Sequence, residues 1–297
     1  MKDVEGKVAF ITGGASGIGF GIARAFLNHG MKVVIADVNE RNLSEAKGYL
    51  AGNNHVHFIK VDVTDRAAMA RAADEAERVF GKIHIVCNNA GIGGGKPMDE
   101  ASYEDWDRVM AVNLGGVING VTAFIPKLKK HGEGGHIVNT SSMAGLIPLP
   151  GAGGIYSASK FAVRGITDSL RLNLAKDNIG VSVLCPGLTR SRMSAGAATR
   201  TVGQPAPASQ TDPGMDPNAA GMDPLQLGEA VLKGIQENAP YIIAHGEFKE
   251  EVKGLFDEIL AAFPPSWEDA DGRRLQFEER RRAATEAARQ GKRPEGF

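Results

Sequence analysis

The chain has 297 residues, with 34 Lys and Arg against 35 Asp and Glu, two Cys and 42% hydrophobic residues. This near-neutral balance gives no basic field for gathering phosphates, so we expect no nucleic-acid partner. Two Cys are too few for a disulfide framework, and both lie in apolar runs, which predicts reduced thiols in a cytoplasmic protein. The charged start, MKDVEGK, does not resemble a signal peptide, and we expect no membrane partner because the apolar runs are too short to span a bilayer.

Short β-rich runs alternate with longer helical patterns from the start of the chain to about residue 190. This alternation predicts an α/β fold with a doubly wound parallel sheet, and the continuously apolar runs predict helices on both faces of that sheet. The expected strands are Val8–Thr12, Lys32–Asp37, Val56–Val61, Ile83–Asn88, His136–Thr140, Gly180–Cys185 and Tyr241–His245. Helical segments are expected at Gly17–Asn28, Arg66–Phe80, Asp105–Leu114 and Tyr156–Lys176.

Two stretches depart from this alternation. Residues 194–224 are rich in Ala, Pro, Gly and small polar residues and show no stable period, which is typical of a linker or of a flexible lid over a site. Residues 264–297 carry interleaved acids and bases, which predicts a solvated, charged C-terminal extension with a helix that frays at its ends. We therefore expect one domain over residues 1–263 and no second domain.

A glycine-rich turn, TGGASGIG at Thr12–Gly19, follows the first expected strand and opens the first expected helix. Glycines let the backbone turn tightly and approach a ligand, while a helix N-terminus offers unpaired N–H groups and partial positive charge to a pyrophosphate. Such a turn can also be only a turn, but the strand before it and the helix after it favour a dinucleotide site. The candidate residues are Gly13, Ser16, Gly17, Ile18 and Gly19.

The ends of the next expected strands supply further candidates at the same sheet edge. Asp37 could accept hydrogen bonds from ribose hydroxyls and would repel a 2′-phosphate, which favours NAD over NADP. It could equally be a turn or helix-capping residue. After the third and fourth strands, the candidates for contacts with the nucleotide are Asp62, Val63, Asn89, Ala90 and Gly91, although Asx and Gly are also ordinary turn residues.

A possible acid/base pair begins the helical segment at Tyr156. Tyr156 and Lys160 are four residues apart and share one helix face, so the ammonium group could lower the phenol pKa from its usual value of about 10. The same spacing also occurs in surface packing pairs. Ser142, at the end of the fifth strand, could hold a substrate oxygen beside the phenol, and Ser141 is an alternative. Asn113 is a polar residue in an apolar helical stretch, which fits either a functional role or helix capping.

From about Lys7 to Met193 the chain resembles the short-chain dehydrogenase/reductase family. The resemblance is carried by the TGxxxGxG turn, the sequence NNAG at 88–91, the helix Asn113, the strand-end Ser142, the YxxxK pair and Pro186-Gly187. It implies a Rossmann-type fold, NAD as cofactor, and a homodimer or homotetramer that packs through the helices at Asp105–Leu114 and Tyr156–Lys176. It also implies that Tyr156 transfers the proton, Lys160 binds the nicotinamide ribose and tunes Tyr156, Ser142 orients the carbonyl or hydroxyl, and Asn113 holds a relay water.

Two departures from the family pattern concern spacing and one pair of side chains. The interval from Ser142 to Tyr156 is one residue longer than usual, and we assign the extra residue to Gly151–Gly154. After Pro186 and Gly187, where the family usually has an apolar residue and then Thr, this chain offers Thr189 and Ser191 as ligands of the cofactor. Because both can still donate hydrogen bonds, we expect cofactor binding to survive.

The segments expected to line the substrate pocket are small and apolar, and no cluster of Arg or Lys marks a phosphorylated substrate. They are Gly93–Gly95, Met143, Leu146–Pro150, Leu188, Met193, Met215 and Met222. This lining predicts a small-molecule alcohol or ketone that is bulky and hydrophobic or aromatic, enclosed by the 194–224 lid. The C-terminal part is similar to that of bacterial Cα-dehydrogenases that oxidise lignin-derived benzylic alcohols, and a hydroxysteroid dehydrogenase is the nearest alternative.

Two other kinds of site are weighed against this interpretation. His55 and His57 would lie on one strand face, but without a third ligand nearby we expect no metal site. A dinucleotide-binding sensor or scaffold without turnover could use the same fold. The joint presence of Asn113, Ser142 and the Tyr156–Lys160 pair argues against a pure binding protein, which has no chemical need for them.

Overall fold

A single parallel sheet organises the molecule. The computed structural model describes residues 1–94, 96–191, 220–264 and 272–292. Seven strands lie in the order β3-β2-β1-β4-β5-β6-β7, and every pair of neighbours is parallel. The strands are β1 Val8–Thr12, β2 Lys32–Asp37, β3 Val56–Lys60, β4 Ile85–Asn88, β5 Gly135–Thr140, β6 Ile179–Leu184 and β7 Tyr241–Ile242. The prediction of one doubly wound α/β domain is confirmed.

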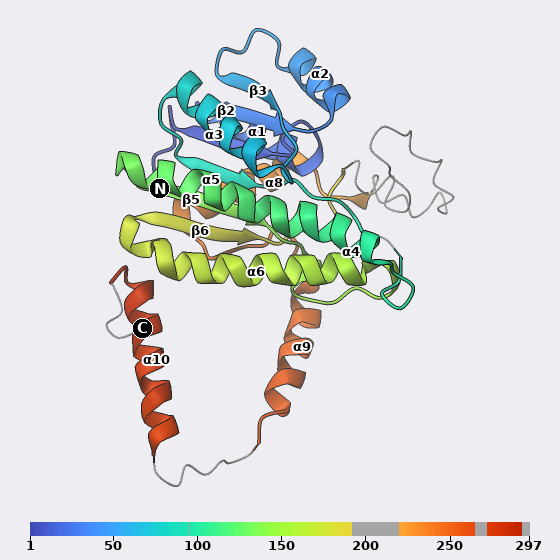
Figure 1. The fold of residues 1–297 in the computed structure, drawn as a ribbon, viewed down its shortest axis with the longest axis vertical. Coiled ribbons are helices and arrows are strands. Elements are labelled where there is room, and N and C mark those ends of the chain that lie inside the picture. Colours follow the sequence, from blue (N-terminus) through green and yellow to red (C-terminus); the bar gives the residue numbers. More distant parts are fainter. Residues whose placement is uncertain (95, 192–219, 265–271, 293–297) are drawn as a thin grey trace.

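Helices cover both faces of the sheet (Figure 1). They are α1 Gly17–Asn28, α2 Glu40–Tyr49, α3 Arg66–Phe80, α4 Tyr103–Met110, α5 Gly116–His131, α6 Gly154–Leu174, α8 Pro224–Glu237, α9 Lys249–Ala261 and α10 Arg273–Arg289. Helices α1 and α8 pack on one face, and α3, α5 and α6 pack on the other. Helices α9 and α10 extend away from this body as an arm.

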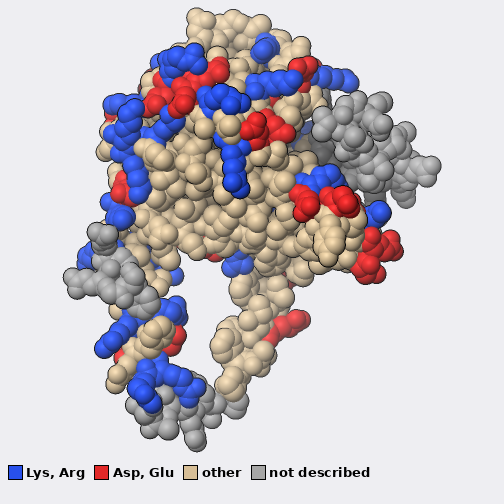
Figure 2. Space-filling view, viewed as in Figure 1, with Lys and Arg blue, Asp and Glu red and all other residues tan. Residues whose placement is uncertain are grey.

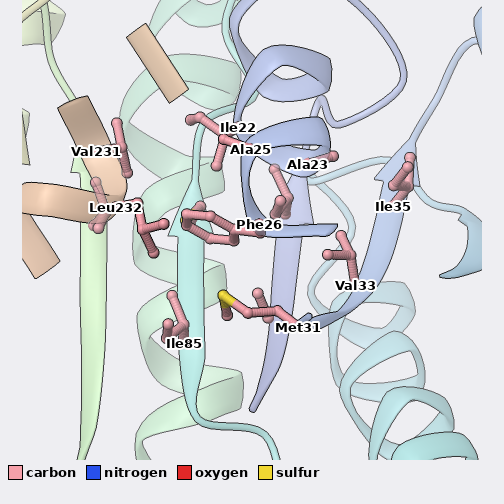
Figure 3. Packing of buried hydrophobic residues seen from close by; sticks show 14 of the residues in the cluster. Ile22, Ala23, Ala25, Phe26, Met31, Val33, Ile35, Ile85, Val231 and Leu232 are labelled. Atoms are coloured by element: carbon pink, nitrogen blue, oxygen red, sulfur yellow. The ribbon is translucent and has the colours of Figure 1, made fainter. Parts of the chain in front are cut away.

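The two faces of each central strand feed two separate hydrophobic clusters. In β1, Ala9 and Ile11 point to the α1–α8 side, whereas Val8 and Phe10 point to the other side. Figure 3 shows the first cluster, in which Phe26 lies between the sheet and the helices that cover it. This alternation explains why the strands read as continuous apolar runs: a strand covered on both sides has no polar face.

The predicted helix at Asp105–Leu114 is part of a longer helical run. The run begins after Ser102, which forms a reciprocal capping box with Asp105, and it passes through a π-helical turn at Ala111–Gly115 into α5. Measured by length and composition, Tyr103–His131 is apolar enough to cross a membrane, although a helix packed in a globular fold passes the same test. Only 39% of its most apolar window is buried, so much of that surface faces outward.

The predicted last strand, Tyr241–His245, is shorter than expected. It is an edge strand that pairs only with β6, through bonds that end at Ile242. His245 instead turns back towards the loop after β6, where its ring accepts a hydrogen bond from the Gly187 N–H at 3.0 Å. The strand therefore ends early because its last residues bind a loop rather than the sheet.

The predicted lid, residues 194–224, lies outside the described residues up to residue 219. The residues on either side of the gap are held together: Met222 pairs with Leu188 and Arg190 through two backbone hydrogen bonds of 2.9 and 3.0 Å. Asp223 then caps α8 by accepting a hydrogen bond from Leu225. A Cβ on Gly21 of α1 would stand only 2.0 Å from the Pro224 oxygen, so the start of α8 lies directly on α1.

Candidate active site

The candidate residues gather at the carboxyl edge of the sheet. The chain builds β1, β2 and β3 outward in one direction and then crosses back to place β4 on the other side of β1. In open α/β sheets such a reversal leaves a crevice between the loops that follow the two strands, and ligands bind there. The glycine turn follows β1, and the NNAG sequence follows β4, so the topology places these two predicted elements on opposite walls of this crevice.

The glycine turn has the backbone geometry that its sequence predicts. Gly13 and Gly17 have φ values of +61° and +51°, a left-handed conformation that favours glycine. A Cβ on Gly19 would stand 2.2 Å from the Gly13 carbonyl oxygen, so a side chain there would close the turn. Ser16 precedes α1 in extended conformation and does not cap the helix with its side chain, and Ile18 packs partly against the core. The turn is therefore compact and lies at a helix N-terminus.

The hydroxyl of Thr12 joins the two walls of the crevice. It accepts hydrogen bonds from the backbone N–H groups of Asn89 and Ala90, at 2.9 and 3.0 Å. The Asn89 amide returns a bond to the Thr12 carbonyl at 3.0 Å. A Cβ on Gly13 would stand 3.0 Å from the Ala90 Cα, which shows how closely the two loops approach. This role of Thr12 is not evident from the sequence, although Thr12 is the first residue of the TGxxxGxG sequence.

Asp37 lies buried at the end of β2 beside the glycine turn. One carboxylate oxygen accepts a hydrogen bond from the Ala15 N–H at 3.2 Å, and the other accepts one from the Asn39 N–H at 2.9 Å. The carboxylate thus bridges the end of β2 to the glycine turn. Both interpretations of Asp37 from sequence, as a ribose acceptor and as a turn residue, are compatible with this geometry.

The two candidates after β3 have different environments. Asp62 is exposed and accepts hydrogen bonds from the N–H and hydroxyl of Thr64, which makes it an Asx-turn residue. Val63 is buried, and its carbonyl accepts a bond from the Asn119 amide of α5 at 2.8 Å. A Cβ on Gly116 would stand 2.7 Å from the Val63 side chain, so α5 comes unusually close to this loop.

Asn113 lies in the middle of the π-helical turn and is completely buried. Its side chain accepts a hydrogen bond from the Ile92 N–H at 2.8 Å and donates to the Ile92 carbonyl and to the Ser159 hydroxyl. A Cβ on Gly91 would stand 3.2 Å from the Asn113 oxygen and 3.4 Å from the Lys160 nitrogen. Single π-helical turns are frequent at functional sites, and here one brings an amide into the crevice.

Tyr156 and Lys160 lie on one face of α6, as predicted. The Lys160 ammonium lies 5.5 Å from the centre of the Tyr156 ring and donates a hydrogen bond to the Thr140 carbonyl at 2.9 Å. Burial lowers the pKa of Lys160 to about 8. Burial also raises the pKa of Tyr156, although the hydrogen bond from Ser142 opposes that shift. The expected lowering of the Tyr156 pKa is therefore wrong for the protein alone, because burial of the phenol outweighs the opposing interaction with Ser142.

The neighbouring serines after β5 have different partners. The Ser141 hydroxyl is buried and donates to the Lys160 backbone carbonyl at 2.8 Å, so it fastens α6 to the sheet. The Ser142 side chain lies close enough to the Tyr156 hydroxyl to lower the pKa of the phenol, against the effect of burial, and its hydroxyl donates to the Pro186 carbonyl at 3.4 Å. It also accepts a bond from the Ala144 N–H at 3.1 Å. The segment predicted to hold the extra residue of the Ser142–Tyr156 interval forms a short 3₁₀ turn at Gly151–Gly153, where Gly151 has a φ of +58°.

The loop after β6 forms the third side of the crevice. The Pro186 carbonyl accepts hydrogen bonds from the Met143 N–H and the Ser142 hydroxyl. Gly187 donates to His245 Nδ1, so the buried His245 ring carries its proton on Nε2 and donates to the Leu188 carbonyl at 3.1 Å. This role of His245 is not evident from the sequence, because its partners lie more than fifty positions away in the chain.

Thr189 and Ser191 follow on the same loop. Thr189 is buried and forms a parallel bridge with Met222. A Cβ on Gly17 would stand 2.9 Å from the Ser191 Cβ, so this part of the loop touches the glycine turn. The fold therefore brings the loops after β1, β4, β5 and β6 together.

Apolar side chains lie beside the first turn of α6, which carries Tyr156. Cβ atoms on Gly153 and Gly154 would stand 2.6 Å from Leu149 and 2.5 Å from Met98. Met98 and Leu149 are both about half exposed, and Leu188 is exposed on the loop after β6. Of the predicted pocket residues, Gly95, Met193 and Met215 lie outside the described residues.

Comparison with known proteins identifies the family. The family model described as short chain dehydrogenase matches residues 7–201. The chain is 38% identical over 291 residues to the C alpha-dehydrogenase of Sphingobium sp. (strain NBRC 103272 / SYK-6), which covers 94% of this chain and 93% of that protein.

Solved structures share the fold over the same length. A putative short-chain dehydrogenase from Novosphingobium aromaticivorans superposes with a TM-score of 0.84 at 38% identity, covering 98% of this chain and 99% of the other. A short chain dehydrogenase/reductase from Burkholderia phymatum in complex with NAD gives a TM-score of 0.79 at 32% identity, covering 91% of this chain and 100% of the other. The protein belongs to the short-chain dehydrogenase family.

Proposed function

We propose that the protein is an NAD-dependent oxidoreductase that interconverts a bulky hydrophobic or aromatic secondary alcohol and its ketone. The observation that carries this proposal is the constellation around Tyr156. Ser142 interacts with its hydroxyl, the Lys160 ammonium lies over its ring, and the group lies at the switch-point edge of the sheet. A phenol, a neutral hydroxyl and a cation in one crevice suit proton transfer to and from an oxygen on carbon.

The residues of the crevice fit a dinucleotide. The glycine turn supplies N–H groups at a helix N-terminus, and the space beside Gly13, Gly17 and Gly19 would be filled by any side chain. Asp37 stands at the end of β2, where a carboxylate favours the 2′-hydroxyl of NAD over the 2′-phosphate of NADP. The nucleotide would be bordered by the residues after β3 and β4, which are Asp62, Val63, Asn89, Ala90 and Gly91. Its nicotinamide end would be bordered by the residues after β6, which are Pro186, Gly187, Thr189 and Ser191. When bound, NAD supplies the hydride acceptor or donor.

Tyr156 moves the proton in this proposal. In ketone reduction it donates its hydroxyl proton to the substrate oxygen, and in alcohol oxidation it accepts that proton. The raised pKa of Tyr156 keeps the phenol protonated near neutral pH, which suits the reduction step. The oxidation step needs the phenolate, so the nearby Lys160 cation and the Ser142 hydroxyl must stabilise it as the proton leaves.

Ser142 and Asn113 have supporting roles. Ser142 orients the substrate oxygen towards Tyr156, because it already contacts the phenol from the end of β5. Asn113 fixes the loop at Ile92 and the first turns of α6 through Ser159, and we assign to it the relay of protons by water towards Lys160. Gly91 leaves the space between the Asn113 amide and the Lys160 ammonium.

The substrate class is inferred from the apolar surroundings of Tyr156. Met98 and Leu149 border the first turn of α6, and neither offers a charge to a polar substrate. An aromatic alcohol would bury apolar surface against such side chains, at about 25 cal/mol per Å² removed from water. The similarity to a C alpha-dehydrogenase over 94% of this chain supports a benzylic alcohol in particular.

A substrate panel tests the proposed specificity. Purified protein with NAD is assayed on benzylic aryl-ether alcohols, hydroxysteroids and short aliphatic secondary alcohols, following the nicotinamide absorbance. We expect kcat/KM for the benzylic alcohols to exceed that for the aliphatic alcohols by about a hundredfold, since each buried methylene or ring edge adds 1–3 kcal/mol. Faster turnover of the aliphatic alcohols would contradict the proposal of an aromatic substrate. A preference for hydroxysteroids would show that the substrate is a hydroxysteroid instead. Tight NADH binding with no turnover of any alcohol would favour a dinucleotide sensor.

We also propose that the protein is a homodimer or homotetramer in the cytoplasm. The exposed residues of α6 recur every fourth position as Phe161, Gly165, Ser169 and Asn173, and all four are uncharged. The apolar surface of Tyr103–His131 lies beside them in the same layer (Figure 2). An uncharged surface of this extent suits contact between subunits. The absence of nucleic-acid and membrane partners stays a prediction.

A further inference from the structure

The first turn of α9 is anchored to the body of the protein. Phe248 and Val252 pack against the small cluster formed by Met143, Leu146, Val183 and Cys185. The Arg164 guanidinium of α6 lies 5.9 Å from the ring of Phe256, one turn further along α9. The helix therefore starts as part of the core and leaves the body in a defined direction.

The apolar stripe of α9 continues beyond this anchor. Phe256, Ile259 and Leu260 have the i, i+3, i+4 spacing of a single helix face, and Phe263 follows at the i+7 position just after the helix ends. All four are exposed, and the exposed fraction rises along the stripe to 64% at Leu260 and 68% at Phe263. Charged residues such as Lys253 and Asp257 pair with each other instead of covering the stripe. A contiguous apolar face of this kind marks a contact surface in a soluble protein.

Helix α10 fixes the other end of the arm. Its C-terminal turn buries Ala288, and a Cβ on Gly291 would stand 3.2 Å from the Ala175 carbonyl beside the end of α6. Figure 1 shows α9 and α10 meeting the body at their near ends while their far ends stand clear of it. The stripe is thus held away from the body by two anchored helices, and every residue from 256 to 264 is exposed.

The charges of the chain indicate what the arm contacts. Helix α10 holds six arginines and three glutamates, so it is basic. The segment 96–108, which includes most of α4, holds five acidic residues and two basic ones. In Figures 1 and 2, α4 stands at the right-hand end of the body and α10 hangs below its left-hand end. These opposite charges are too far apart to meet within one chain, but two copies related by a twofold axis can bring them together.

The stripe is also continuous with the uncharged face of α6. Phe161 and Gly165 of that face flank Arg164, and Arg164 in turn lies against the ring of Phe256 on α9. Between the α6 face and the start of the stripe lies the Arg164–Asp168 ion pair, and the Arg164 guanidinium is stacked on the aromatic rings of Phe256 and Tyr241. A partner that covers the α6 face therefore meets a neutralised pair before it reaches the stripe.

We propose that the arm formed by α9 and α10 clasps a second copy of this chain. The apolar stripe of α9 buries itself on the partner copy, and the basic α10 lies towards the acidic α4 segment of that copy. The arm thereby extends the subunit contact proposed for α5 and α6. The two contacts can be separated by experiment, because the arm residues are distinct from those on α5 and α6.

Sedimentation velocity over a concentration series tests the clasp in the full-length protein. The test variant is Leu260→Glu with Phe263→Glu, and the matched control is Val79→Glu, which charges an exposed apolar residue of α3. We expect the arm variant to weaken self-association by about tenfold or more, which corresponds to ~1.4 kcal/mol. The control should associate like the wild type. An unchanged dissociation constant for the arm variant, with its thermal unfolding also unchanged, would overturn the proposal.

Hydrogen exchange supplies a second readout that does not depend on a variant. Amides of residues 256–263 in the wild type should exchange more slowly above the dissociation constant than below it. Equally fast exchange at both concentrations would contradict the clasp. Co-sedimentation of a monomeric wild type with phosphatidylcholine–phosphatidylglycerol vesicles, lost in the arm variant, would overturn the proposal in favour of a lipid surface.

Discussion

At the scale of single residues, adjacent side chains of the same type have different tasks. Ser141 and Ser142 are adjacent residues just after strand β5, yet their side chains have different partners. The Ser141 hydroxyl donates to the Lys160 carbonyl of α6, whereas the Ser142 hydroxyl donates to the Pro186 carbonyl and its side chain interacts with the phenol of Tyr156. One serine should therefore matter for stability and the other for turnover.

Two alanine variants separate these tasks. Ser142→Ala should lower kcat by about a hundredfold, since a donor aimed at a reacting oxygen contributes on this order. Ser141→Ala should leave kcat nearly unchanged but lower the free energy of unfolding by about 1–3 kcal/mol, because a buried carbonyl loses its partner. Steady-state kinetics and urea unfolding measure the two effects. The reverse pattern would assign the catalytic role to Ser141.

The residue types that could be predicted from sequence are those whose chemistry depends on short spacing. The four-residue interval between Tyr156 and Lys160 and the glycines of the Thr12–Gly19 turn fall in this class. Thr12 and His245 acquire their roles through partners 77 and 58 positions away. Such contacts arise only when the sheet aligns strands that are distant in sequence, so no local pattern reveals them. Likewise, the raised pKa of Tyr156 follows from burial, which spacing does not show.

At the scale of elements, the π-helical turn at Ala111–Gly115 is the main departure from a simple pattern. Asn113 is expected from sequence within an ordinary helix, and helix capping is an equal alternative. The extra residue in this turn instead buries the amide against Ile92 and Ser159. A π-helical turn has no distinct sequence period, so only the packing of α4 and α5 on the sheet reveals it.

Strand β5 carries a buried histidine that should govern stability in acid. His136 bonds the Ser182 hydroxyl at 2.8 Å, and its other ring nitrogen, Nδ1, is buried without a partner. Burial lowers the pKa of His136 from 6.5 to about 3, with smaller contributions from the N-terminal ammonium and Arg171. Between these two pH values the unfolded chain binds a proton that the folded protein excludes, so folding weakens as the pH falls.

We therefore expect His136→Gln to flatten the acid side of the stability profile. In the wild type, His136 should reduce the free energy of unfolding by up to about 1.4 kcal/mol for each pH unit below 6.5. In the variant this contribution disappears, whatever its stability at neutral pH. Urea unfolding from pH 7 to pH 4 measures the slope, and His55→Gln, at an exposed position, is the control. Equal slopes in all three proteins would show that His136 does not remain neutral.

At the scale of the whole molecule, the alternation of strands and helices was sufficient to predict the doubly wound sheet. It could not predict the arm. The charged tail was expected to be a solvated extension, and α10 is indeed helical and largely exposed, but its last turn packs against the end of α6. The outward direction of α9 depends on how Phe248 and Val252 seat in the core, which is a property of the folded body.

The arm lies within the part of the chain that the Novosphingobium protein matches. The superposition with the Novosphingobium protein covers 98% of the chain, so it includes most of the residues after α8. A shared arm of this length argues that the extension belongs to the working form of the protein. The proposed clasp would give the extension a role in self-association, because binding to a second copy removes the apolar stripe of α9 from water.

The central claim is that Tyr156 transfers the proton in an NAD-linked reaction, and Tyr156→Phe tests it most directly. The variant keeps the ring over Lys160 and removes only the hydroxyl. We predict that NADH formation from the best benzylic alcohol falls by about a hundred- to ten-thousandfold, the range attributed to general acid–base groups, while NADH binding measured by fluorescence stays nearly unchanged. Turnover close to that of the wild type, with NADH binding intact, would contradict the account.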